Sequence, residues 1–376
     1  MCKKPAGPNY FPPPESKGGW RYLKESSDVR DVAGMDAARL EEVYRAQESR
    51  YADHSWSIAI FRHGWLVREF HTFNVLAHTR FDIWSGTKSF SGTAWGLLLD
   101  DSLQKRTPKG AQGTQGITLD TPAYPFIPEG YPLSDPRKER ITFRHLLTMT
   151  SGIPGEDSGC EGMATATWVG PFEHALGKAP NRLGNWTDQL NGEPGARFEY
   201  SDPAICHLAL AFANITGREM HDYLDQRIFR PIGIENLSWD VQGGSGFLGP
   251  HTNAHTGVHI SARELARFCY LMLKRGSWEG QQLVPEWWLD LSTQTSQELN
   301  PKYGYTWWVN TRNARWPGMP TDMFALSGYR YNKGYVIPSL DLVITRVASG
   351  PANNDDPQVV AWDEQGFVRG IVEACY

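Results

Sequence analysis

The pattern of hydrophobic and polar positions predicts strands near both ends of the chain and helices in its middle. Helical spacing of apolar residues over 35–52 predicts a helix, and apolar runs at 57–61 and 65–70, joined by Arg62-His63-Gly64, predict a β-hairpin. Further helices are expected over 141–150, 205–216, 220–228, 262–274 and 358–376. Further strands are expected over 305–310, 323–327, 334–337 and 341–347.

This order of elements predicts one α/β (α+β) layer that is built from both ends of the chain and interrupted by a mainly helical domain. We assign an extended Pro- and Gly-rich arm to 1–28, the α/β domain to 29–100 and 301–376, and the helical domain to 101–300. The connections 105–136 and 151–198 are long and rich in glycine and proline. Loops of that length in a compact protein usually have a function, so we expect them to border an active site.

Composition narrows the class of protein. The chain of 376 residues is 40% hydrophobic and 21% charged, as expected of an ordinary globular protein with a large core. Its net charge is −5 and it has no basic cluster, so nucleic acid is not an expected partner. No run of about 18 apolar residues predicts a transmembrane segment. The start Met1-Cys2-Lys3-Lys4 fits either a cytoplasmic protein or a processed periplasmic lipoprotein acylated on Cys2.

The segment Ser85-Gly86-Thr87-Lys88 places a hydroxyl and an amine one helical turn apart at the start of an apolar helix. If burial removes the lysine's proton, the amine can accept the serine's proton, which makes Ser85 a nucleophile. The apolar run Trp95–Leu99 is expected to bury this helix. The alternative is an ordinary surface pair. A second match, from Ser102 to Lys105, lies in a polar stretch where its lysine would be solvated, and we interpret it as chance.

Two further segments carry candidate chemistry. Tyr200-Ser201-Asp202 precedes an apolar helix, and a phenol beside a lysine ammonium is expected to have its pKa lowered towards neutrality. The alternative is a packed ring with a tethered hydroxyl. The stretch Phe324–Tyr329 leads into a hairpin turn, and such a strand edge can direct a backbone N–H at an acyl oxyanion. By itself it is equally an ordinary hairpin.

Metal and cofactor chemistry are not indicated. His251, His255 and His259 recur every four residues, but the residues between them include a glycine and form a poor helix, which favours hydrogen-bonded loop histidines over metal ligands. The sequence has no Gly-x-Ser-x-Gly elbow, no Walker-type phosphate loop and no dinucleotide fingerprint. We therefore expect neither a metal nor an organic cofactor.

Taken together and in this order, these segments resemble the serine β-lactamase-like hydrolases. That superfamily includes penicillin-binding proteins, class C β-lactamases, class VIII carboxylesterases, D-aminopeptidases and 6-aminohexanoate-dimer hydrolases. The stretches 141–154, 255–268 and 335–346 agree with the family pattern, and the resemblance extends over roughly residues 30–376. It implies a β-lactamase/transpeptidase-like fold, in which helices flank an antiparallel sheet and a helical domain is inserted.

The resemblance also implies roles for individual residues. Ser85 would be the acylated nucleophile, Lys88 its base, and Tyr200 the partner that moves the proton to the leaving group. The backbone N–H groups of Ser85 and Tyr329 would form the oxyanion hole. Asp202 stands where β-lactamases usually carry the Asn that binds the substrate amide.

The position of the usual Lys-Thr-Gly motif departs from the β-lactamase pattern. This chain has Leu326-Ser327-Gly328 there, so the cation that would hold a β-lactam carboxylate is absent from its usual place. The difference favours esters or small amides as substrates, although Arg330 or Lys333 is available to meet an anionic substrate group. We expect the substrate to contact a set of polar and aromatic residues. They are Asp202, Ser327, Gly328, Trp84, Trp168 and Trp186.

The sequence therefore predicts a serine hydrolase that acts on a small-molecule ester or amide through an acyl-enzyme. The alternatives are a β-lactamase, a D-amino-acid peptidase, an acyltransferase, or a catalytically silent protein similar to penicillin-binding proteins. The natural substrate, the oligomeric state and the compartment are not predicted.

Overall fold

The computed structural model describes residues 10–50, 54–106, 116–160, 170–242, 248–349 and 362–376. A six-stranded antiparallel sheet organises these residues, with strand order β10-β11-β12-β13-β1-β2. The strands are β1 (Trp56–Arg62), β2 (Trp65–His71), β10 (Trp308–Val309), β11 (Phe324–Gly328), β12 (Asn332–Ile337) and β13 (Leu342–Ala348).

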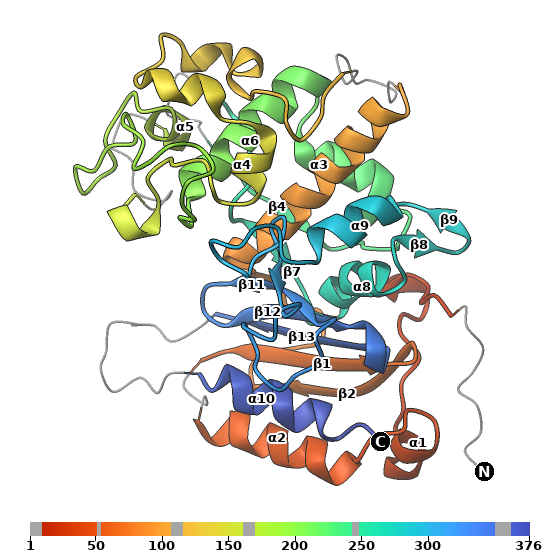
Figure 1. Cartoon of the computed structure of the whole chain (residues 1–376). Coiled ribbons are helices and arrows are strands. Elements are labelled where there is room, and N and C mark those ends of the chain that lie inside the picture. The colour runs from red at the N-terminus through yellow and green to blue at the C-terminus, as the bar shows by residue number, and fades with distance from the viewer. Residues whose placement is uncertain (1–9, 51–53, 107–115, 161–169, 243–247, 350–361) are drawn as a thin grey trace.

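The sheet joins the two ends of the chain. Strand β1 pairs with β13 from Trp56 opposite Ala348 to Arg62 opposite Leu342. Every residue of both strands is buried, because helices cover both faces of the sheet. Helices α2 (Ala37–Arg50) and α10 (Glu364–Val372) lie on one face, and α8 (Ala262–Leu273) lies on the other (Figure 1). Successive residues of β1 therefore enter two different hydrophobic clusters.

Helix α3 (Thr87–Leu103) passes through the centre of the helical part of the molecule (Figure 1). Its residues are buried from Thr87 to Ser102, which is typical of a core helix that packs on all sides. Close packing explains Gly96, because a Cβ there would lie 2.3 Å from the ring of Trp288. The other helices are α1 (Ser26–Asp31), α4 (Phe143–Leu147), α5 (Pro171–Ala175), α6 (Asp202–Thr216), α7 (Met220–Leu224) and α9 (Glu286–Ser292).

Short strands complete the described architecture. A three-stranded sheet with the order β3-β7-β4 connects the helical part to the segment that precedes α3. These strands are β3 (Phe81–Asp82), β4 (Ser238–Trp239) and β7 (Val258–Ile260). Two small hairpins contain β5 (Val241–Gln242), β6 (His251–Thr252), β8 (Ser277–Trp278) and β9 (Gln281–Gln282). No helix in the described ranges has the length and apolar content needed to cross a bilayer.

The structure confirms the predicted fold class, the first hairpin and helices α2, α6 and α8 to within a few residues. The helix expected over 141–150 is shorter, because Thr142 caps its start and Met149 has φ 59° just beyond its end. The helix expected over 220–228 is interrupted, since α7 continues as a π-helical turn, Asp225–Phe229. The predicted extended arm overlaps α1, which begins at Ser26.

Candidate active site

The turn before α3 holds Ser85 in a constrained position. Strand β3 leads into a 3-10 turn, Trp84–Gly86, in which Trp84 has φ 50°. A left-handed conformation is costly for a bulky side chain and is typical of functional sites. The Asp82 carboxylate accepts hydrogen bonds from the N–H of Trp84 at 2.8 Å and of Gly257 at 3.1 Å, which stabilises this turn.

The structure brings Ser85 and Lys88 together. Lys88 Nζ donates a hydrogen bond to Ser85 Oγ at 2.7 Å, and the lysine is 1% exposed. The ammonium also donates to the backbone carbonyl of His255 at 3.4 Å. The turn before α3 and the first turn of α3 therefore present a half-buried serine in contact with a buried lysine, an arrangement that suits nucleophilic catalysis by serine.

Asp202 lies against the same lysine. Its Oδ1 is 2.6 Å from Lys88 Nζ, and both side chains are buried. Asp202 is the first residue of α6, where the helix dipole favours a carboxylate, and Ser201 caps that helix by accepting a hydrogen bond from Ala204 N–H at 3.1 Å. The lysine that contacts Ser85 therefore also forms a buried ion pair with a carboxylate from a helix far away in the sequence.

Tyr200 packs beside the Ser–Lys pair. Lys88 Nζ lies 4.7 Å from the centre of the Tyr200 ring, and the rings of Tyr303 and Trp308 lie 6.2 and 6.1 Å away. The expectation of a lowered pKa is wrong. Burial above all, with the negative charge of Asp202, raises the pKa of Tyr200 well above its ordinary value, although its hydrogen bond with Ser85 acts in the other direction. The phenol keeps its proton and is suited to donate it.

The end of β11 contacts the turn that carries the nucleophile. A Cβ on Gly328 would lie 1.8 Å from the carbonyl oxygen of Ile83 and 3.0 Å from the nitrogen of Gly86, so only glycine fits there. The predicted oxyanion-hole residues, Ser85 and Tyr329, are each adjacent in sequence to one of these two touching glycines. The two backbone segments that carry the predicted N–H donors are therefore in contact.

Ser327 faces away from Ser85. Its hydroxyl accepts a hydrogen bond from Lys333 Nζ at 2.6 Å, and Lys333 also lies 3.3 Å from the carboxylate of Glu364 in α10. Alternate residues of a strand point to opposite faces, so Ser327 lies on the α10 face while Leu326 and Gly328 lie towards the nucleophile turn. Burial lowers the pKa of Lys333 to about 8. Lys333 is 5% exposed, and the structure does not place it to meet a substrate anion.

The tryptophans predicted to contact the substrate lie in different places. Trp84 lies at the site, with its ring 5.4 Å from that of Tyr329 in an edge-on contact. Trp186 is 48% exposed, on the loop before Tyr200, and Trp168 lies outside the described residues. Sequence reasoning missed Trp308, whose ring is stacked with Tyr200. The aromatic-rich run 303–308 was the signal that could have indicated it.

The three regularly spaced histidines have separate surroundings. His251 pairs with Glu219 at 2.8 Å and His259 with Asp240 at 3.2 Å. His255 is buried, which lowers its pKa to about 4. Within the described ranges, no group of three or more His, Cys, Asp or Glu side chains is arranged to hold a metal ion.

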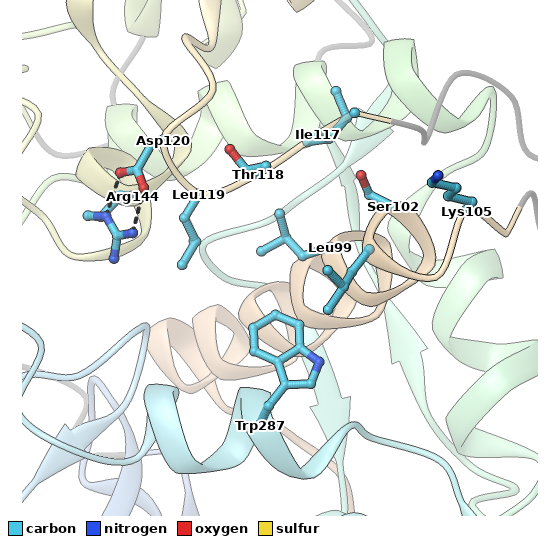
Figure 2. Close-up of a pocket in the computed structure, with 11 residues that line it drawn as sticks. Leu99, Ser102, Lys105, Ile117, Thr118, Leu119, Asp120, Arg144 and Trp287 are labelled. Atoms are coloured by element: carbon cyan, nitrogen blue, oxygen red, sulfur yellow. Dashed lines mark hydrogen bonds and ion pairs between the residues drawn. The ribbon is translucent and has the colours of Figure 1, made fainter.

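A cavity of about 670 Å³ lies beside the C-terminal end of α3, which carries Leu99 and Ser102, whereas Ser85 precedes the N-terminal end of this helix. Figure 2 shows the residues that line the cavity. Leu99, Leu119 and Trp287 form its apolar lining, and an Asp120–Arg144 ion pair lies at one end. Lys105, from the second Ser-x-x-Lys match, is exposed at its border, as expected of a chance match. The cavity does not reach the nucleophile turn.

The chain is similar to known proteins in sequence and in fold. A sequence model of the Beta-lactamase family matches residues 40–365. Protein flp of Staphylococcus aureus (strain MW2) is 25% identical over 173 residues, which is 43% of this chain but only 28% of that protein.

Two solved structures illustrate the similarity in fold. A candidate 6-aminohexanoate-dimer hydrolase from Bacillus anthracis has a TM-score of 0.64 at 18% identity, covering 97% of this chain and 88% of the other. EstCE1, a hydrolase with promiscuous acyltransferase activity, has a TM-score of 0.65 at 16% identity, covering 90% and 98%. At these identities the structural matches establish the fold alone.

Proposed function

The chain belongs to the β-lactamase family of serine hydrolases, and on that premise we propose that it cleaves carboxylic esters or small amides through an acyl-enzyme on Ser85. The observation that carries the proposal is the hydrogen bond of 2.7 Å between the buried Lys88 Nζ and the half-buried Ser85 Oγ. Tyr200 beside this pair supplies a phenol that keeps its proton.

In the proposed acylation, Ser85 Oγ forms a bond to the substrate carbonyl carbon and Lys88, in its amine form, accepts the hydroxyl proton. The N–H groups of Ser85 and Tyr329 hold the oxyanion, a contribution of about 3–4 kcal/mol for each donor. Tyr200 gives its proton to the leaving oxygen or nitrogen as that bond breaks, and Lys88 returns a proton to the phenolate. Water then attacks the acyl-enzyme by the reverse sequence of proton transfers.

The preference for esters or small amides rests on the strand beside the nucleophile. Leu326 stands where the β-lactamase pattern has the cation that binds a β-lactam carboxylate. Lys333 instead forms a hydrogen bond with Ser327 and an ion pair with Glu364 on the other face of the sheet. The names of the two fold neighbours, a hydrolase with acyltransferase activity and an aminohexanoate-dimer hydrolase, agree with this substrate class.

The test compares hydrolysis of p-nitrophenyl butyrate with hydrolysis of nitrocefin by the wild type, Ser85→Ala and Ser102→Ala. We expect ester hydrolysis in the wild type and in Ser102→Ala, none in Ser85→Ala, and slow or no nitrocefin hydrolysis. Ser102 is the matched control because it belongs to the second Ser-x-x-Lys match, near the remote cavity. Fast nitrocefin hydrolysis would identify a β-lactamase, and full activity of Ser85→Ala would refute the assignment of the nucleophile.

One observation favours a second candidate, a protein that is acylated but does not turn over. Asp202 Oδ1 lies 2.6 Å from Lys88 Nζ, and an amine held by this carboxylate is less available to activate the water that would release the acyl group from Ser85. A fluorescent penicillin that labels Ser85 stoichiometrically, with no hydrolysis of esters, short peptides or amides, would support this candidate over the hydrolase.

A further inference from the structure

We infer that Arg330 forms an anion-binding subsite beside Ser85, and that the preferred substrates are esters or amides whose acyl chain ends in a free carboxylate. This inference rests on the proposed function, and it names the substrate class of the same site.

The β11–β12 hairpin places Arg330 next to the nucleophile turn. Arg330 and Tyr331 form the tip of the hairpin, with φ 58° and 65°. Gly328 contacts the turn that carries Ser85, and the arginine two residues later lies over one aromatic ring from that turn, Trp84, and one from the hairpin, Tyr329. Its Cζ is 5.5 Å from the centre of the Trp84 ring and 5.8 Å from that of Tyr329.

The guanidinium of Arg330 has an N–H donor available for a ligand. Arg330 Nε is buried and has no hydrogen-bond partner, and within the described part of the chain Arg330 forms no ion pair. Other arginines near the sheet do have such partners: Arg315 pairs with Glu364, and Arg263 pairs with Glu69. Leaving a buried N–H without an acceptor costs free energy, and a bound carboxylate would recover that cost. The planar guanidinium also matches a carboxylate with two parallel hydrogen bonds.

The residues between Ser85 and Arg330 indicate which kind of chain joins the scissile carbonyl of the substrate to its carboxylate. Trp84 is partly exposed and Tyr329 is 51% exposed, so they offer an apolar surface between Ser85 and Arg330. Lys333, the other cation of this hairpin, is buried on the opposite face. A short methylene chain between the scissile carbonyl and a terminal carboxylate fits this arrangement, as in monoesters and monoamides of dicarboxylic acids.

The test compares p-nitrophenyl hydrogen glutarate with p-nitrophenyl valerate, which has an acyl chain of equal length and no charge. We expect the wild type to favour the glutarate by at least about tenfold in kcat/KM, the gain typical of one charge-assisted hydrogen bond. Arg330→Gln should abolish that preference and Arg330→Lys should retain part of it. Arg312→Gln, which removes an exposed arginine paired with Glu298, should behave as the wild type.

Each outcome decides the question. A preference that disappears in Arg330→Gln while valerate hydrolysis persists supports the subsite and shows that the variant is folded. An equal loss on both substrates means that Arg330 only holds Trp84 in place, and an unchanged preference means that it does not meet the substrate. Either result would overturn the inference while leaving the hydrolase intact. If the wild type hydrolyses neither ester, the proposed function itself fails.

Discussion

Asp202→Asn is the most informative single substitution at this site. It keeps the size and shape of the side chain, but it removes the negative charge that lies 2.6 Å from Lys88 Nζ. Lys88 is buried, so the variant leaves its amine without the carboxylate partner that it has in the wild type. Removing one partner of a buried ion pair is destabilising, and we therefore expect a lower free energy of unfolding.

The size of the effect follows from the geometry. Two unit charges 2.6 Å apart attract by about 6 kcal/mol at an effective dielectric constant of about 20, and the desolvation of both groups reduces the net value. Even a third of this attraction, about 2 kcal/mol, is a large part of the 5–15 kcal/mol, roughly, by which folded proteins are stable. We therefore expect Asp202→Asn to lower the free energy of unfolding by at least about 2 kcal/mol.

The assay is urea unfolding of the wild type, Asp202→Asn and Asp290→Asn at one pH. Asp290→Asn is the control because it makes the same chemical change at an exposed ion pair with Arg275, which should contribute little to stability. If Asp202→Asn unfolds within about 0.5 kcal/mol of the wild type, the contact between Asp202 and Lys88 does not stabilise the fold, and the reasoning is refuted.

Three further predictions test the supports of the site. Gly328→Ala should lower the free energy of unfolding by about 2–3 kcal/mol, measured with urea, and lower kcat, because its Cβ would overlap the Ile83 carbonyl; wild-type values would contradict that contact. Burial lowers the pKa of Lys333 from 10.5 to about 8. Between these two pH values the unfolded chain binds a proton on Lys333 that the folded chain does not bind, so the free energy of unfolding rises with pH. The stability of the wild type relative to Lys333→Met should thus increase by on the order of 1–3 kcal/mol from pH 8 to 10, and a flat difference would be inconsistent with it. Trp186→Ala should change the relative kcat/KM for p-nitrophenyl esters of different acyl length, and an unchanged series would exclude Trp186 from the substrate cleft.

Elements with strong periodicity were predictable from the sequence. The hairpin of β1 and β2 and the amphipathic helix α8 follow directly from the spacing of their apolar residues. The proximity of Ser85 to Lys88 was also predictable, because a serine and a lysine three residues apart share one face of a helix. Local geometry alone fixes these features.

Features that depend on tertiary contacts were not predictable. The contact between Asp202 and Lys88 depends on how α6 packs beside α3. Burial of Tyr200, with a smaller contribution from the negative charge of Asp202, raises the pKa that the sequence predicts to fall. The orientation of Ser327 depends on the register of β11 with β12, which sets Ser327 opposite Lys333. Strand β3 has only two residues, too few to show a period, yet it directs the chain into the nucleophile turn.

The β11–β12 hairpin has an apolar residue, Leu326, where the β-lactamase pattern has a cation, and it has a cation, Arg330, at its tip. Leu326 Cδ1 would lie 3.1 Å from a Cβ on Gly86, so the usual cation position is packed with apolar atoms against the nucleophile turn. A positive charge there would be buried without a partner, which is costly. Arg330, at the tip of the same hairpin, carries its charge beyond the aromatic rings of Trp84 and Tyr329 instead. An anion bound by Arg330 is therefore separated from the scissile carbonyl by an apolar surface, which suits a flexible acyl chain better than the compact ring system of a β-lactam.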